Sequence, residues 1–160
     1  MKNVDITELT EIAEKRAATF GTTSLTCLHT TLWAIQDALK DVDSIDYATP
    51  NLMKATNALA YMGNCGVYLA GGIALSLKYG TEDYTNGEQV LATGWKGMAY
   101  GDWFKKQFGS ANCFDLSGGS DFSTMEGMMA YMSSEEKIEQ CRNYCVAASR
   151  KLIELLTESE

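Results

Sequence analysis

Apolar residues recur along this chain at the three- and four-residue intervals of helices that bury one face. The first such stretch spans residues 6–20, begins at the capping-box spacing of Asp5 and Glu8, and ends at Gly21. The second follows a Thr-Thr-Ser turn, which we expect to cap it, and continues to Leu39. The N-terminal quarter of the chain therefore predicts two amphipathic helices.

The middle of the chain predicts two further helices. One is expected to start at Thr49 as the N-cap, with Pro50 at the first helical position. Residues 65–80 are apolar on nearly all sides, which predicts a buried central helix. Because Gly71 and Gly72 each cost about 1 kcal/mol relative to alanine inside a helix, we expect another backbone or a cofactor to approach closely there.

The segment after the central helix is richer in glycine. Residues 86–109 predict two short helices with a break near Gly101, followed by a loop at 110–113. Residues 114–133 combine a Gly/Ser-rich flexible stretch with a short helix. That helix is expected to pack into the core, or to act as a movable flap over the Cys113 region or as a partner-docking helix. The methionines on its one face are Met125, Met128, Met129 and Met132.

The last helix follows a second capping box at Ser133 and Glu136 and keeps an apolar stripe to Leu155. No segment shows the alternating pattern of a strand, and no internal repeat is visible. We therefore expect an all-α bundle of about five or six helices, forming a single domain over residues 1–160.

Composition restricts the classes of function. Hydrophobic residues make up 46% of the chain and charged residues 21%, which is typical of a globular protein. A net charge of −8 disfavours binding to nucleic acids and to anionic membrane surfaces. No apolar run reaches the roughly 18 residues of a membrane span, and Met1 to Asp5 lack the apolar stretch of a signal peptide. We expect a cytoplasmic protein.

The five cysteines are the strongest candidates for chemistry. Their odd number and the expected reducing compartment favour metal binding, redox chemistry or inert core positions over a disulfide framework. Cys27 and Cys65 lie at predicted helix starts, where unpaired amides stabilise a thiolate. Cys113 is expected in a loop and Cys141 in the last helix. Spacing alone leaves open whether these four residues converge.

Several segments around these cysteines resemble the C-GCAxxG-C-C family, a group of small redox-active proteins named for four cysteines in this order. The family is related to the split-Soret cytochromes, but this chain has no C-x-x-C-H motif, so covalent haem is not implied. The chain departs from the central motif at Ala70, where the family has glycine. The matching segments are Thr26-Cys27-Leu28, Cys65-Gly66-Val67-Tyr68, Lys78-Tyr79-Gly80, Phe108-Gly109-Ser110-Ala111-Asn112-Cys113, and Cys141 with Ala147-Ala148.

The resemblance implies a redox role with an iron–sulfur cluster or a thiol pair on Cys27, Cys65, Cys113 and Cys141. The alanines downstream favour Cys141 over Cys145 as the fourth cysteine of the pattern.

Three hypotheses follow for the function. The first is an oxidoreductase or electron carrier in which the four cysteines bind an iron–sulfur cluster and exchange electrons with a partner protein. The second is metal-free thiol–disulfide chemistry, with Cys65 attacking and Cys27 or Cys113 resolving. The third is a structural zinc site or a helical interaction module. The acidic surface and aromatic-rich core are also compatible with a homodimer.

Overall fold

The computed structural model describes residues 5–158, so Met1 to Val4, on which the signal-peptide prediction relies, lie outside the described part. In this part the chain folds into α-helices, one 3₁₀ helix and an isolated β-bridge, which confirms the all-α prediction. The helices exceed the predicted five or six. They are α1 (Ile6–Ala17), α2 (Cys27–Leu39), α3 (Pro50–Thr56), η1 (Asn57–Tyr61), α4 (Gly66–Tyr79), α5 (Gly87–Phe108), α6 (Cys113–Leu116), α7 (Met125–Met132) and α8 (Glu135–Thr157).

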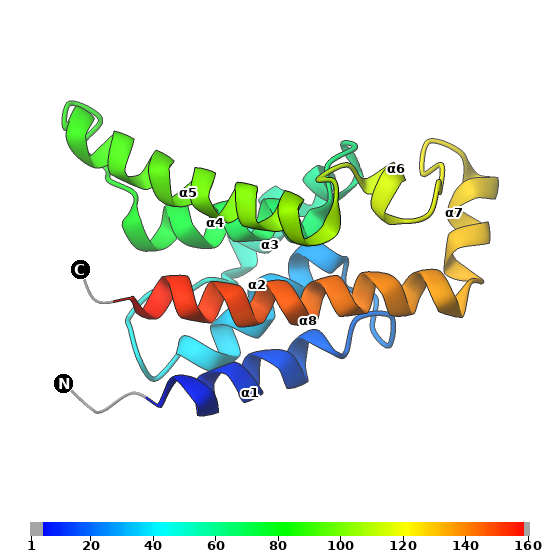
Figure 1. The fold of residues 1–160 in the computed structure, drawn as a ribbon, viewed down its shortest axis with the longest axis horizontal. Coiled ribbons are helices and arrows are strands. Elements are labelled where there is room, and N and C mark those ends of the chain that lie inside the picture. Colours follow the sequence, from blue (N-terminus) through cyan, green and yellow to red (C-terminus); the bar gives the residue numbers. More distant parts are fainter. Residues whose placement is uncertain (1–4, 159–160) are drawn as a thin grey trace.

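The longest helix, α8, runs through the middle of the molecule and packs against α1, α2 and α4 (Figure 1). Helix α5 covers the far side of α4, while α6 and α7 lie together at one end of the bundle. The hydrophobic core lies between these long helices, and Leu32, Ile35 and Leu152 are fully buried in it. None of the helices within residues 5–158 is long and apolar enough to cross a membrane.

The first two helices differ from the prediction at their ends. Helix α1 ends at Ala17 rather than at Gly21, because the chain turns there against α8 and Gly21 takes a φ of 84°. A Cβ at Gly21 would lie 2.3 Å from Ile138 Cγ2, so the turn depends on glycine. The N-cap of α2 is Thr26, which accepts a hydrogen bond from the His29 amide, and not the earlier Thr-Thr-Ser turn.

The central helix α4 forms where it was predicted, with Gly80 at its C-cap. It is not buried on all sides, since Leu77 is 40% exposed. A Cβ at Gly71 would lie 2.1 Å from the ring of Tyr100, whose hydroxyl donates to the Val67 carbonyl at 3.0 Å. The close approach expected at the two glycines is therefore made by a tyrosine side chain, while Gly72 faces open space.

Helix α5 is continuous, so the predicted break near Gly101 is wrong. Gly101 is buried inside the helix, where an added Cβ would lie 3.1 Å from the Tyr68 hydroxyl. It serves close packing between α4 and α5 rather than a turn. The ends were predicted correctly, because Asn86 caps the start and Gly109, with a φ of 85°, ends the helix.

Three further predictions concern the start of α3, the loop before Cys113 and the exposure of α7. The start of α3 is confirmed, since the Thr49 side chain accepts a hydrogen bond from the Leu52 amide and Pro50 opens the helix. The predicted loop at 110–113 ends one residue early, because Asn112 caps the short helix that Cys113 begins. Helix α7 is mostly exposed, with Met125 at 74%, so a core position for this stripe is wrong.

Candidate functional site

The four cysteines of the predicted site line one cavity of about 190 Å³. Cys27 comes from the first turn of α2, Cys65 from the N-cap of α4, Cys113 from the start of α6 and Cys141 from α8. The fold thus brings together four segments that are far apart in the sequence, at the end of the bundle where α6 and α7 lie (Figure 1). The geometry does not itself assign the cysteines a ligand role.

Cys27 and Cys65 form a direct pair within this cavity. The Cys27 thiol donates a hydrogen bond to the Cys65 sulfur. The start of α4 comes close enough for this because residue 66 is glycine. A Cβ there would lie 2.6 Å from Cys27 Sγ and 2.9 Å from the Leu28 amide nitrogen. Gly66 therefore allows two helix starts to meet at two sulfur atoms.

The two thiols of the pair differ in acidity. The hydrogen bond from Cys27 and the amide groups of Val67 and Tyr68 lower the pKa of Cys65, and burial only partly opposes them. The same hydrogen bond raises the pKa of Cys27, and burial raises it further. Cys65 is therefore the member of the pair that holds negative charge most readily, as expected for a thiol at a helix N-terminus.

A short antiparallel bridge places Cys113 beside Cys65. The Cys65 amide donates to the Ala111 carbonyl at 2.8 Å, and the Cys113 amide donates to the Gly63 carbonyl at 2.8 Å. Burial, together with the nearby Cys65 and Cys141, raises the pKa of Cys113 to about 12. Cys113 is thus held as a neutral thiol next to the more acidic Cys65.

Cys141 lies under a tyrosine that the sequence analysis did not single out. The Tyr131 hydroxyl donates a hydrogen bond to Cys141, which lowers the pKa of this thiol, although burial has the larger effect and raises it. Tyr131 belongs to α7, and Met128 and Met132 of the same helix also line the cavity. The only sequence signal for Tyr131 was its place within the methionine-rich helix that we predicted beside Cys113.

Cys145 occupies a different position from the other four cysteines. It is 0% exposed, does not line the cavity, and its thiol lies 3.9 Å from the Cys27 carbonyl oxygen. Burial raises its pKa. The fourth cysteine at the cavity is therefore Cys141, one helical turn earlier.

His29 of α2 is buried with its ring nitrogens engaged. Its Nε2 lies 2.9 Å from the Met53 carbonyl and its Nδ1 lies 3.1 Å from Thr26 Oγ1. Thiolate sulfur is the donor that zinc and iron–sulfur clusters favour. Even so, no group of three or more His, Cys, Asp or Glu residues in the described part of the chain is arranged to hold a metal ion. The zinc and iron–sulfur hypotheses stay predictions.

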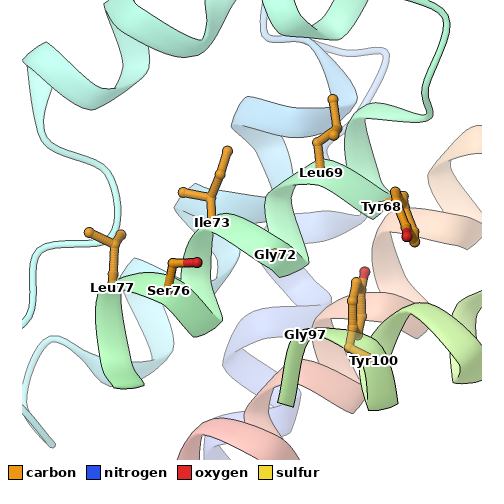
Figure 2. A pocket seen from close by; sticks show the side chains of 8 residues that line it. All are labelled: Tyr68, Leu69, Gly72, Ile73, Ser76, Leu77, Gly97 and Tyr100. Carbon is orange, nitrogen blue, oxygen red and sulfur yellow. The ribbon is translucent and has the colours of Figure 1, made fainter. Parts of the chain in front are cut away.

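A second hollow, of about 460 Å³, lies between α4 and α5 and contains no cysteine (Figure 2). Leu69, Ile73 and Leu77 line it along α4, and Tyr68 and Tyr100 close one end. It offers no nucleophilic thiol and no carboxylate, histidine or lysine among its lining residues. Although it is larger, we place the candidate site at the cysteine cavity, where the reactive side chains are.

An all-α fold with four cysteines from four segments around one cavity defines a class of small cysteine-based proteins. The model of one family, described as "Putative redox-active protein (C_GCAxxG_C_C)", matches residues 25–155. The chain belongs to this family, which confirms the resemblance noted in the sequence. No curated protein and no solved structure matches the chain.

Proposed function

We propose that this protein is a thiol–disulfide redox protein whose reactive groups are Cys65 and Cys27. The observation that supports this most directly is the hydrogen-bonded thiol pair at two adjoining helix starts, open to a cavity. Membership of a redox-active family supports the broader redox assignment. The lowered pKa of Cys65 favours it as the attacking sulfur.

The proposed reaction is a two-step exchange with a disulfide substrate. The Cys65 thiolate attacks one substrate sulfur, the substrate S–S bond breaks, and the departing sulfur takes up a proton. The Cys27 thiol then loses its proton and attacks Cys65 Sγ, and the second substrate sulfur leaves and is protonated. The protein dithiol is oxidised by two electrons to a disulfide, and the substrate is reduced to two thiols.

The structure favours Cys27 over Cys113 as the resolving residue. Cys27 already contacts Cys65 through a hydrogen bond. Cys113 lies beside the pair, and the pKa values of Cys27 and Cys113 are both raised, so the choice depends on this direct contact. We therefore assign attack to Cys65 and resolution to Cys27.

Thiol counting before and after mild oxidation tests this proposal. The reduced protein should lose two thiols, and peptide mapping should find a Cys27–Cys65 disulfide. Cys65→Ser should abolish this loss, while Cys145→Ala, which changes a buried thiol away from the cavity, should leave it intact. Retention of all five thiols, or a disulfide between other residues, would contradict the assignment.

An iron–sulfur electron carrier is a second candidate function, because all four cysteines of the family pattern line the same cavity. In this case Cys27, Cys65, Cys113 and Cys141 would hold the cluster, which would supply one-electron transfer to a partner protein. Anaerobic reconstitution with iron and sulfide should then give a brown protein with broad visible absorbance and stoichiometric iron and sulfide. A colourless, iron-free product would count strongly against this function.

A further inference from the structure

We propose that the cavity beside Cys27 and Cys65 accepts a small, uncharged, apolar disulfide as the redox substrate and rejects charged ones. This inference rests on the proposed thiol–disulfide function and adds the substrate class. It follows from the chemistry of the cavity wall, its volume and the contrast between that wall and the charge of the whole protein.

The wall of the cavity is apolar and uncharged. Within residues 5–158, no Asp, Glu, Lys, Arg or His side chain lines it. Its surface comes mainly from aliphatic, aromatic and thioether side chains. Those side chains include Phe20, Leu25, Val67, Leu116, Phe122, Met128, Met132 and Ile138.

Several polar side chains of the wall already have partners inside the protein. The Tyr131 hydroxyl donates to Cys141. The Tyr144 hydroxyl accepts from Gln140 Nε2 at 2.7 Å and donates to the Leu116 carbonyl at 3.3 Å. Thr26 Oγ1 accepts from the His29 amide at 3.3 Å. A carboxylate entering the cavity would lose its water and meet no opposite charge, and an ammonium would meet only the Cys65 thiolate, which the reaction consumes, so both are unfavourable.

The volume fits a compact molecule. An apolar cavity of about 150 Å³ holds benzene, so the 190 Å³ here suits a disulfide with two short alkyl arms. Oxidised glutathione, a peptide disulfide with several charges, fits neither the volume nor the wall. The sulfur atoms of four cysteines and two methionines on the wall also present polarisable surface to a sulfur-containing substrate.

The charge of the whole protein predicts a different selectivity from the cavity. A net charge of −8 attracts cations and repels anions, so long-range steering alone would make a cationic disulfide react fastest. The apolar wall instead predicts that a neutral disulfide reacts fastest and that both charged ones react slowly. The two effects are therefore separable by experiment.

The test uses three disulfides of nearly equal length with the reduced full chain. They are 2-hydroxyethyl disulfide, which is neutral, cystamine, which is cationic, and dithiodiglycolate, which is anionic. Each rate of two-thiol loss is divided by the rate of the same disulfide with 2-mercaptoethanol at the same pH. We expect the neutral disulfide to exceed both charged ones by at least about tenfold in this ratio, because a buried charge is costly.

A matched pair of variants tests whether the wall is responsible. Met132 lines the cavity and is 63% exposed, while Met129 of the same helix is 62% exposed and does not line it. Met132→Lys should raise the normalised rate with dithiodiglycolate several-fold, and Met129→Lys should leave it unchanged.

The outcomes separate this inference from the function on which it rests. If cystamine is fastest, or the three normalised rates are equal, while a Cys27–Cys65 disulfide still forms, the substrate class is wrong and the thiol–disulfide function stands. Equal effects of the two lysine variants also overturn the inference. If none of the three disulfides oxidises the pair, both the function and the substrate class fail.

Discussion

Replacement of Gly66 by alanine probes the contact that brings the two reactive sulfurs together. The new Cβ would lie 2.6 Å from Cys27 Sγ, 2.9 Å from the Leu28 nitrogen and 3.1 Å from Leu28 Cβ. Ordinary contacts are about 3.5–4.0 Å, so the start of α2 must move by roughly 1 Å. Two of these three neighbours belong to Leu28 of the first turn of α2, so the strain falls on the helix itself and not only on a flexible side chain.

The expected cost follows from this overlap. Extra atoms in a well-packed region destabilise a protein by about 1–3 kcal/mol. Alanine recovers less than its usual advantage of about 1 kcal/mol over glycine, because Gly66 is the first residue of α4 and not an interior one. We expect Gly66→Ala to lower the free energy of unfolding by about 1–2 kcal/mol, with a thermal midpoint lower by about 2–4 °C per kcal/mol. The Cys27–Cys65 disulfide should form more slowly.

The assay is urea unfolding of the reduced protein followed by circular dichroism, together with the rate of thiol loss. Gly72→Ala is the matched control on the same helix, because a Cβ at Gly72 meets no atom within 4 Å. That variant should gain about 0.5–1 kcal/mol and keep the rate of thiol loss. If Gly66→Ala is as stable as Gly72→Ala and oxidises as fast as the natural chain, the close approach of α2 and α4 does not control the pair.

Two further predictions concern individual thiols in the full chain, mapped by alkylation and mass spectrometry. The lowered pKa of Cys65 means that its thiolate persists to lower pH. The pH of half-maximal alkylation of Cys65 should therefore lie below the pKa of about 8.5 of free cysteine. The corresponding pH for Cys113 should lie well above it. A midpoint for Cys65 at or above that of Cys113 would refute the assignment of the attacking sulfur. Tyr131→Phe removes a hydrogen bond that lowers the pKa of Cys141. The pH of half-maximal alkylation of Cys141 should therefore rise, while that of Cys113 stays the same. An unchanged pH midpoint for Cys141 would exclude the contact. The titratable groups whose charge acts on Cys65 are Cys27 of α2, Tyr100 of α5, Cys113 of α6, and Cys141, Tyr144 and Cys145 of α8.

Local signals in the sequence predicted most of the helices and several of their ends. Thr49 and Pro50 opened α3 and Gly109 ended α5, because caps and stops depend on a few adjacent residues. The predictions of helix breaks and ends failed where tertiary contacts, and not adjacent residues, determine the course of the chain. Gly101 suggested a break, but its missing side chain makes room for Tyr68 across the helix interface. Gly21 suggested a helix end, but the chain left the helix earlier to turn against α8.

The same distinction applies to the candidate site. The positions of Cys27 and Cys65 at helix starts were predictable from capping residues and the glycines around them. Their contact was not, because it depends on how closely α2 and α4 pack, which spacing along the chain does not encode. The pairing of Tyr131 with Cys141 likewise requires α7 to return over the cavity after a loop with no helical pattern.

The pairing of positions 27 and 65 links oxidation to the stability of the fold. A disulfide between them would close a loop that includes α2, α3 and η1 and ends just before α4. In the chain-entropy description, such a loop disfavours the unfolded state by about 4 kcal/mol. Because folding and oxidation are linked in one thermodynamic cycle, folding makes oxidation of the pair more favourable by the same amount. The redox state of two sulfurs at one end of the bundle would thus set how long the whole chain resists unfolding and proteolysis.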